Sequence, residues 1–256
     1  MKDFANKLFT AARHLTISKK GSHNEILHKE IKQSLLFFPL AGFYIGLLLV
    51  LINFTASHFL PSPVIDILII LFLLVFTEAK HLKGFLSMVT GITRFSETKL
   101  MPSNIELKLF LLLFFVLMMK FLLLNNIVLG WKNEVLLVMP VLGRWSLVFF
   151  PYLQMNRPKE KLDINPLYGE IDVKDFWIAT IIASIIVLLL GINGIFIFML
   201  ITFAAVIFEQ LYQRKIHGIP ENLSLGIVEV TEILTLLFFI ALESGSRNFT
   251  SEGILV

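Results

Sequence analysis

The sequence predicts an all-α fold, a polytopic bundle of seven transmembrane helices, and three observations support this. The first is composition: of 256 residues, 56% are hydrophobic and 16% are charged, and the mean hydropathy is +0.81. A water-soluble domain could not bury so much apolar surface in one core. The second is a series of long apolar stretches, and the third is the distribution of Lys and Arg between them.

Seven stretches are long enough to span the hydrocarbon of a bilayer, which takes about 20 mostly apolar residues. They lie at residues 35–54, 61–77, 109–127, 134–153, 176–192, 193–211 and 224–243. The connections 55–60 and 191–194 are short, and they predict tight antiparallel hairpins. Residues 34–243 are therefore predicted to form one transmembrane domain, between an N-terminal arm at 1–33 and a C-terminal tail at 244–256.

Basic residues lie mainly on one side of the predicted bundle. Of the 22 Lys and Arg residues, 18 fall in the arm 1–33 and in the connections 78–108, 154–175 and 212–223. Lys132 and Arg247 fall on the other side, and Lys120 and Arg144 fall within spans. Since cationic loops stay on the cytoplasmic side during insertion, we predict a cytoplasmic N-terminus and an external C-terminus.

The N-terminal arm has an amphipathic pattern. Phe4, Leu8 and Leu15 share one helical face, with Lys7 and Arg13 off it. This pattern is suited to a helix in the headgroup layer of membrane lipids, and a plain cytoplasmic tail is the alternative. The arm lacks the apolar core of a cleaved signal peptide.

Composition also excludes several classes of function. The chain has no Cys, which excludes disulfides, thiolate metal sites and cysteine-based catalysis. The net charge of +3 is explained by membrane orientation, so no nucleic-acid partner is expected.

Ionisable residues inside a membrane are costly unless they are paired or hydrated, which makes them informative. Glu229 and Glu232 are three residues apart, on one face of a helix. They could hold a hard divalent cation, or they could pair with Arg144 in a structural ion-pair network. Lys120 could likewise be a buried tether. Asp66 lies one turn into the second span, where it could reach the outer interface, and it is assigned no role.

The connection 78–108 is long for a link between two helices, and long links are commonly functional or disordered. It contains His81 between the cations Lys80 and Lys83. Such a histidine is either a solvated residue or a ligand, and no second His stands at metal-ligand spacing. These residues alone do not identify a reaction.

Several segments resemble the cobalamin synthase family, also called adenosylcobinamide-GDP ribazoletransferase. Residues 38–46 (FPLAGFYIG) are similar to the family's FPLxGxxxG segment, and 143–145 (GRW) to its (G/S)R(W/G) span. Residues 77–91 align without a gap to TGGxHLDGLADTxDG, and 214–232 to RRLGGxTGDxLGAxxELxE. Lys120 meets a recurring Lys of the family.

The resemblance implies a Mg²⁺-dependent transferase, multi-pass in the cell inner membrane, that acts at the cytoplasmic face in the last steps of cobalamin biosynthesis. A hydroxyl of α-ribazole, or of its 5′-phosphate, would attack the phosphate of adenosylcobinamide-GDP next to the cobinamide, and GMP would leave. Carboxylates would hold the metal, and cations would neutralise the phosphates. Assembly as a homo-oligomer is left open.

The chain departs from the family at its acidic positions. Lys83, Ser87, Thr90 and Asn222 stand where the motifs have Asp. Where the family has its DS(R/H)xGxxG segment, the chain reads PSNIELKL at 102–109. Glu78, Glu106 and Glu221 each stand within five residues of a lost Asp, so relocated carboxylates could rebuild a metal site.

From the resemblance we assign three sets of site residues. The catalytic set is His81, Arg144 and Asn222; the substrate-binding set is Lys80, Lys83, Ser103, Asn104 and Lys120; and the metal set is Glu78, Glu229 and Glu232. Arg144 would offer bidentate donors to phosphate oxygens, and His81 would orient a ligand or assist proton transfer.

Two other classes of function remain as alternatives. One is a catalytically impaired homologue that binds a corrinoid or a nucleotide, or that docks onto another membrane protein. The other is a small-solute transporter, for which paired Gly or Pro breaks in two halves are expected, and the sequence shows no such pairing.

Overall fold

The computed structural model describes residues 34–94, 105–154, 171–215 and 221–252, and every regular element in these ranges is helical. The elements are η1 (Leu35–Phe37), α3 (Phe38–Ala56), α4 (Ser62–Phe76), α5 (Lys80–Arg94), α6 (Ile105–Asn125), η2 (Leu129–Trp131), α7 (Lys132–Gln154), α8 (Val173–Val187), η4 (Leu188–Leu190), α9 (Gly191–Lys215) and α10 (Glu221–Glu252). The predicted arm 1–33 lies outside the described residues.

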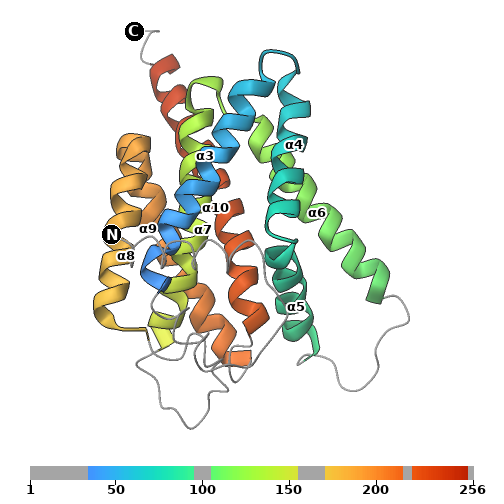
Figure 1. Ribbon diagram of the computed structural model, residues 1–256, viewed down its shortest axis with the longest axis vertical. Coiled ribbons are helices and arrows are strands. Elements are labelled where there is room, and N and C mark those ends of the chain that lie inside the picture. The colour runs from blue at the N-terminus through green and yellow to red at the C-terminus, as the bar shows by residue number, and fades with distance from the viewer. Residues whose placement is uncertain (1–33, 95–104, 155–170, 216–220, 253–256) are drawn as a thin grey trace.

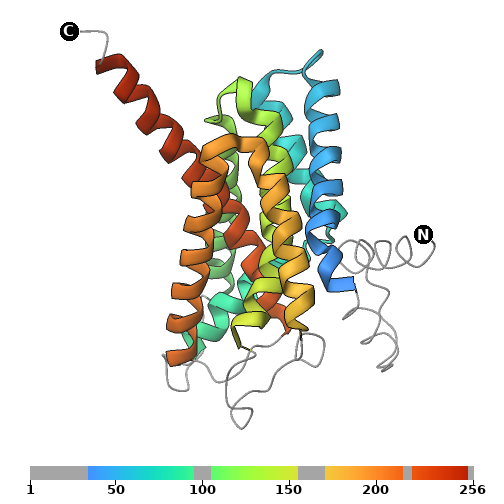
Figure 2. The same cartoon turned by 90° about the vertical axis from the view of Figure 1, so that its left-hand side faces the viewer.

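The helices run back and forth along the long axis of the molecule (Figures 1 and 2). α5, the start of α6, the end of α7, the start of α8, the end of α9 and the start of α10 lie at the lower end of Figure 1, called here the α5 end. The α3–α4, α6–α7 and α8–α9 turns lie at the opposite end, as does the end of α10. The helix ends that flank the three predicted cytoplasmic connections therefore share one side of the bundle.

The chain is a multi-pass membrane protein by the length and composition of its helices. Within the described residues, five helices can cross a membrane, or six if α4 and the first part of α5 form one broken span. Val173–Leu211 counts as one of the five, yet its 39 residues reach roughly 58 Å, about twice the hydrocarbon thickness. The backbone reverses at Gly191, where φ is 59°, and α8 and α9 lie side by side in Figure 2. The count of seven crossings and the cytoplasmic side of the N-terminus stay predictions.

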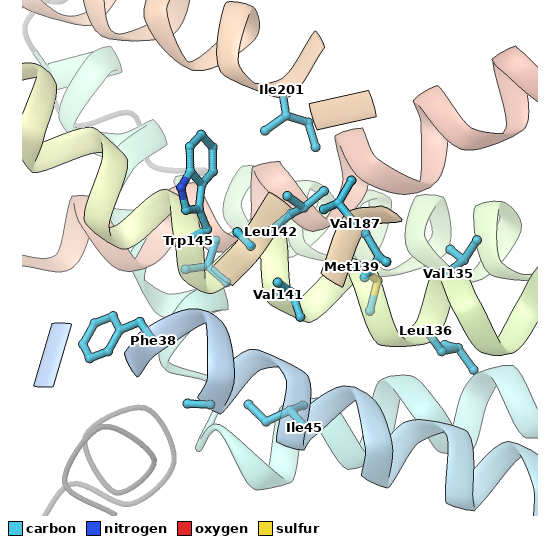
Figure 3. Close-up of a cluster of buried hydrophobic side chains, with 14 of the residues drawn as sticks. Phe38, Ile45, Val135, Leu136, Met139, Val141, Leu142, Trp145, Val187 and Ile201 are labelled. Atoms are coloured by element: carbon cyan, nitrogen blue, oxygen red, sulfur yellow. The ribbon is translucent and has the colours of Figure 1, made fainter. Parts of the chain in front are cut away.

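The core surrounds α7, the most buried of the long helices. Figure 3 shows side chains of α7, among them Val141, Leu142 and Trp145, between α3 and the α8–α9 hairpin. The Trp145 ring stacks on Phe149 at 4.7 Å between ring centroids, and its Nε1 donates to Thr180 Oγ1 at 3.1 Å. α7 thus connects two layers of helices through apolar packing and one interhelical hydrogen bond.

α3 and α7 touch backbone to backbone, and two glycines of the 38–46 segment make this possible. A Cβ on Gly42 would lie 2.5 Å from Pro140 O, and one on Gly46 would lie 2.8 Å from Leu137 Cα. Small residues allow helices in a membrane to approach this closely. The FPLAGFYIG segment is therefore explained by helix packing.

The second predicted span, 61–77, corresponds to α4, which ends at Phe76; the chain then bends by 84° and continues as α5. The bend contains Glu78 and Ala79 at φ of 51° and 52°, a left-handed conformation that L-residues adopt at a cost. α5 occupies part of the connection 78–108, where the sequence analysis placed no helix. It is amphipathic, with Leu82 and Met88 buried and Lys83 exposed.

Asp66, which was given no role and could have extended to the outer interface, is paired inside the bundle. It is fully buried, its Oδ1 lies 2.6 Å from Lys132 Nζ, and Asn125 Nδ2 donates to its Oδ2 at 3.2 Å. Lys132, expected in an exposed connection, is also buried and donates to Ser62 Oγ at 2.9 Å. These bonds join α4, α6 and α7 at the end opposite α5. In hydrocarbon, pairing costs less than leaving either charge alone.

At the C-terminus, α10 continues to Glu252. The helix therefore includes residues 244–252 of the predicted tail.

Candidate functional site

α5 is pressed against α10 at one glycine contact. A Cβ on Gly226 of α10 would lie 2.8 Å from the carbonyl carbon and oxygen of Gly84 in α5. Such a contact excludes any larger residue at position 226 unless the helices separate. It places the first turn of α5, with His81, beside the charged residues of α7 and α10.

Five buried polar side chains from four helices meet there, and together they are called the buried charge cluster. They are His81 (α5), Lys120 (α6), Arg144 (α7), Glu229 and Glu232 (α10), with exposed fractions between 0% for Arg144 and 5% for Glu229. The spacing of three residues between the two glutamates puts both on the same face of α10. The sequence analysis named all five as site residues.

The contacts within the buried charge cluster are direct. Lys120 Nζ donates to Glu229 Oε1 at 2.7 Å and to Glu232 Oε2 at 2.6 Å. The Arg144 guanidinium donates to Glu232 Oε1, and its second terminal nitrogen donates to His81 Nε2 at 3.3 Å. Because Arg has only donors, His81 Nε2 is the acceptor and the ring proton is on Nδ1.

The four charges of this cluster balance, two cations against two carboxylates. Removing one partner from such a buried pair leaves an uncompensated charge, which costs about 3–5 kcal/mol. Gly143 lets α7 approach α10 here, because a Cβ at this position would lie 3.1 Å from Glu232 Cγ. The cluster therefore ties four helices together at the α5 side of the core.

The cavity at the buried charge cluster is too small for a substrate. Its volume is about 10 Å³, which is near the minimum for a single water molecule. The rest of its lining is apolar apart from Thr77, whose hydroxyl donates to Leu73 O at 2.7 Å; these residues are Ile70, Leu73, Leu74, Thr77, Leu82 and Leu117. The sequence analysis missed Thr77 as a neighbour of the site, although it opens the segment 77–91.

The other face of α5 is accessible. The Lys83 side chain is exposed, and Ser87 lies one turn further along the same face. The Lys80 side chain is 16% exposed, and its Nζ lies 3.8 Å from Glu78 Oε2. Lys83 and Ser87 present a cationic and a hydroxyl group at the α5 end, on the side of the helix away from the buried charge cluster, whereas the Lys80 Nζ atom is buried.

The predicted site residues thus fall into four groups. His81, Lys120, Arg144, Glu229 and Glu232 are brought together, and Glu78, Lys80 and Lys83 lie on the neighbouring surface. Asn222 belongs to the first turn of α10 by its backbone. Ser103 and Asn104 lie outside the described residues.

The predicted metal set does not fit a divalent cation in this structure. No group of three His, Asp or Glu side chains within the described residues is placed to hold a metal. Each glutamate of the buried charge cluster already binds a cationic side chain. Glu78 lies outside this cluster and faces Lys80.

Comparison with known proteins gives one consistent family. The model of the cobalamin-5-phosphate synthase family matches residues 7–240. The adenosylcobinamide-GDP ribazoletransferase of Clostridium tetani is 25% identical over 222 residues, which cover 84% of this chain and 88% of that protein. The protein of the same name from Geotalea daltonii is 27% identical, with 91% and 96% covered, and that from Clostridium botulinum strain Langeland is 24% identical, with 94% and 99% covered.

No solved structure matches the chain. The family match and the relatives, by contrast, cover nearly its whole length. The chain therefore belongs to the cobalamin-5-phosphate synthase family.

Proposed function

We propose that this chain is an adenosylcobinamide-GDP ribazoletransferase of the cell inner membrane. It joins adenosylcobinamide-GDP to α-ribazole, or to α-ribazole 5′-phosphate, and releases GMP. The observation that carries this proposal is the family match over residues 7–240, together with relatives that share one name. The exposed cationic face of α5 supports it, because the corrinoid substrate contains a diphosphate.

The transfer exchanges one phosphorus–oxygen bond for another. A ribazole hydroxyl oxygen bonds to the phosphorus next to the cobinamide, and the bond from that phosphorus to the bridging oxygen breaks. The electron pair stays on the GMP phosphate, and the hydroxyl proton is released. Since the leaving group is a stable phosphate anion, the main demands on the protein are orientation of the two substrates and stabilisation of negative charge.

The residues of the site have two roles: some hold α5 in position, and others provide charge or polar groups at the accessible surface. The buried charge cluster holds α5 against α7 and α10, which fixes the direction of the exposed α5 face. Lys83 on that face supplies positive charge, and Lys80, Asn222, Ser103 and Asn104 remain predicted contributors. His81 and Arg144 act by holding α5 in place, since neither is open to a substrate in this conformation.

A turnover assay tests the proposal. Purified full-length protein in detergent, given adenosylcobinamide-GDP and α-ribazole, is expected to release one GMP for each nucleotide-loop product, measured by liquid chromatography and mass spectrometry. The assay is run with Mg²⁺ and with EDTA, and the Lys174→Gln variant serves as a control, because this lysine is exposed on α8. Binding of the corrinoid without GMP release in either condition would overturn the transferase and favour the impaired homologue.

A further inference from the structure

The charge arrangement at the α5 end differs from that of a metal-dependent phosphoryl-transfer site. Such a site uses carboxylates to hold a hard cation, and the cation neutralises the phosphates. Here Glu229 and Glu232 are engaged by Lys120 and Arg144 at the distances given above. A divalent cation at the same oxygens would have to displace these side chains and would then be repelled by them.

The accessible surface beside the buried charge cluster is positively charged, whereas a surface that binds a metal ion is negatively charged. Lys83 is exposed and forms no ion pair with any described residue, and Lys80 lies three residues before it on α5. The Lys80 Nζ atom itself is buried and has no hydrogen-bond partner among the described residues, so Lys83 is the ammonium group that an anion meets at this surface. Glu78 offsets only one of the two positive charges.

Lys83 also takes the place of an acid. In the alignment that the resemblance provides, position 83 is the first of the motif aspartates. The change replaces a side chain that could bind a metal by one that repels it and binds phosphate directly. The contact of α5 with α10 holds position 83 on the face of α5 that is turned away from the buried charge cluster.

We propose that Lys83 forms the centre of a metal-free diphosphate site, in which its ammonium group takes the place of a divalent cation. The ligand class is a nucleoside diphosphate or its ester. The inference rests on the proposed function for the identity of the substrate, but the binding surface itself is defined by α5. Diphosphate binding to this surface is therefore independent of Mg²⁺ and dependent on the charge at position 83.

Equilibrium binding of GDP to the purified full-length protein tests this site. The wild-type protein is expected to bind GDP with the same affinity, within about twofold, in EDTA and in Mg²⁺. Lys83→Gln is expected to weaken binding by about tenfold in both conditions, because a hydrogen bond to a charged group is lost. Lys83→Arg keeps the charge and is expected to retain binding.

Matched controls separate this effect from misfolding and from general surface charge. Lys174→Gln removes an exposed lysine at the same end of the bundle and is expected to leave GDP affinity unchanged. The unfolding temperature of Lys83→Gln is expected to match that of the wild type, since the side chain is exposed. GDP binding that requires Mg²⁺, equal losses in Lys83→Gln and Lys174→Gln, or no GDP binding in either condition would each overturn the inference.

The inference and the proposed function fail in different ways. Ribazole transfer that needs Mg²⁺ would overturn the metal-free site and leave the transferase intact. GDP binding in EDTA that depends on Lys83, without any ribazole transfer, would support the metal-free site and overturn the transferase.

Discussion

Glu232 is the residue on which the buried charge cluster depends most. Its carboxylate accepts from both Lys120 and Arg144, whereas Glu229 accepts from Lys120 alone among the described contacts. Loss of the Glu232 charge therefore leaves two buried cations with one carboxylate between them. Loss of the Glu229 charge leaves Lys120 with its second partner.

We predict that Glu232→Gln lowers the free energy of unfolding by about 3–5 kcal/mol, because one buried positive charge is left without a counterion. Glu229→Gln is expected to cost less. Thermal and denaturant unfolding in detergent, followed by tryptophan fluorescence from the buried Trp145, would measure both variants. Equal stabilities for Glu232→Gln and the wild type would show that the cluster contributes nothing to folding.

At the level of single residues, the rule that intramembrane charges are informative identified Lys120, Arg144, Glu229 and Glu232, whereas His81 came from the family resemblance. Pairing of the glutamates with Arg144 was one expectation, and Arg144 does bind Glu232. The rule could not assign Lys120 to the glutamates, because Lys120 and Glu229 are 109 residues apart and meet only through helix packing. The same limit applies to Asp66. Its partner Lys132 was placed in a connection because it lies between two of the apolar stretches, and the sequence gives no sign that the two residues pair. Pairing in space decides whether such a residue reaches the interface or stays buried.

Among the elements, α5 packs closely against α10. Its inner face meets α10 where Gly84 and Gly226 leave no room for a Cβ. Its direction relative to α4 is set by the 84° bend and by the left-handed residues Glu78 and Ala79. The orientation of the cationic face therefore depends on packing at one backbone contact.

We predict that Gly226→Ala loosens α5 and lowers stability by about 1–3 kcal/mol, because the new methyl group overpacks a closed contact. The chain has no cysteine, so a single Cys at the buried Leu82 reports on the separation of the helices. Its reaction with a maleimide is expected to accelerate in Gly226→Ala. Gly245→Ala is the control, since no atom lies within 4 Å of a Cβ there, and equal labelling rates in both variants would contradict the prediction.

The long apolar helices could be read from the sequence, while α5 could not. Hydropathy marks a helix that meets lipid on most sides, as with α6, whose Phe114 and Phe115 are exposed. α5 has alternating polar and apolar residues and lies at the end of the bundle, so its pattern is weaker than that of a span. Its docking depends on Gly226, far away in sequence, whose role becomes visible only when the two backbones are seen in contact.

On the scale of the whole molecule, the two ends of the bundle differ in their connections. The turn after α3 is short and ends the bundle on one side, whereas α5 and the start of α8 lie on the other (Figure 1). If the bundle spans the membrane, residues at these two ends face different compartments. The absence of native cysteine makes this difference measurable.

We predict that Phe59→Cys and Lys174→Cys are labelled from opposite sides of the membrane. Phe59 is 86% exposed in the turn after α3, and Lys174 is exposed at the start of α8. An impermeant maleimide added to intact cells is expected to reach position 59, and position 174 only after the membrane is opened. Labelling of both positions in intact cells would contradict the predicted topology.

The buried contact between Lys120 and the glutamates also has a consequence for biosynthesis. The lysine leaves the ribosome 109 residues before Glu229, which at roughly 5–20 residues per second is an interval of about 5–20 s. Throughout that time its ammonium group would be in lipid without the carboxylates that compensate it in the finished protein. We expect α6 to stay at the insertion machinery, or close to the aqueous interface, until α10 has been made. Integration of α6 into the membrane is then completed only after the C-terminal part of the chain has been synthesised.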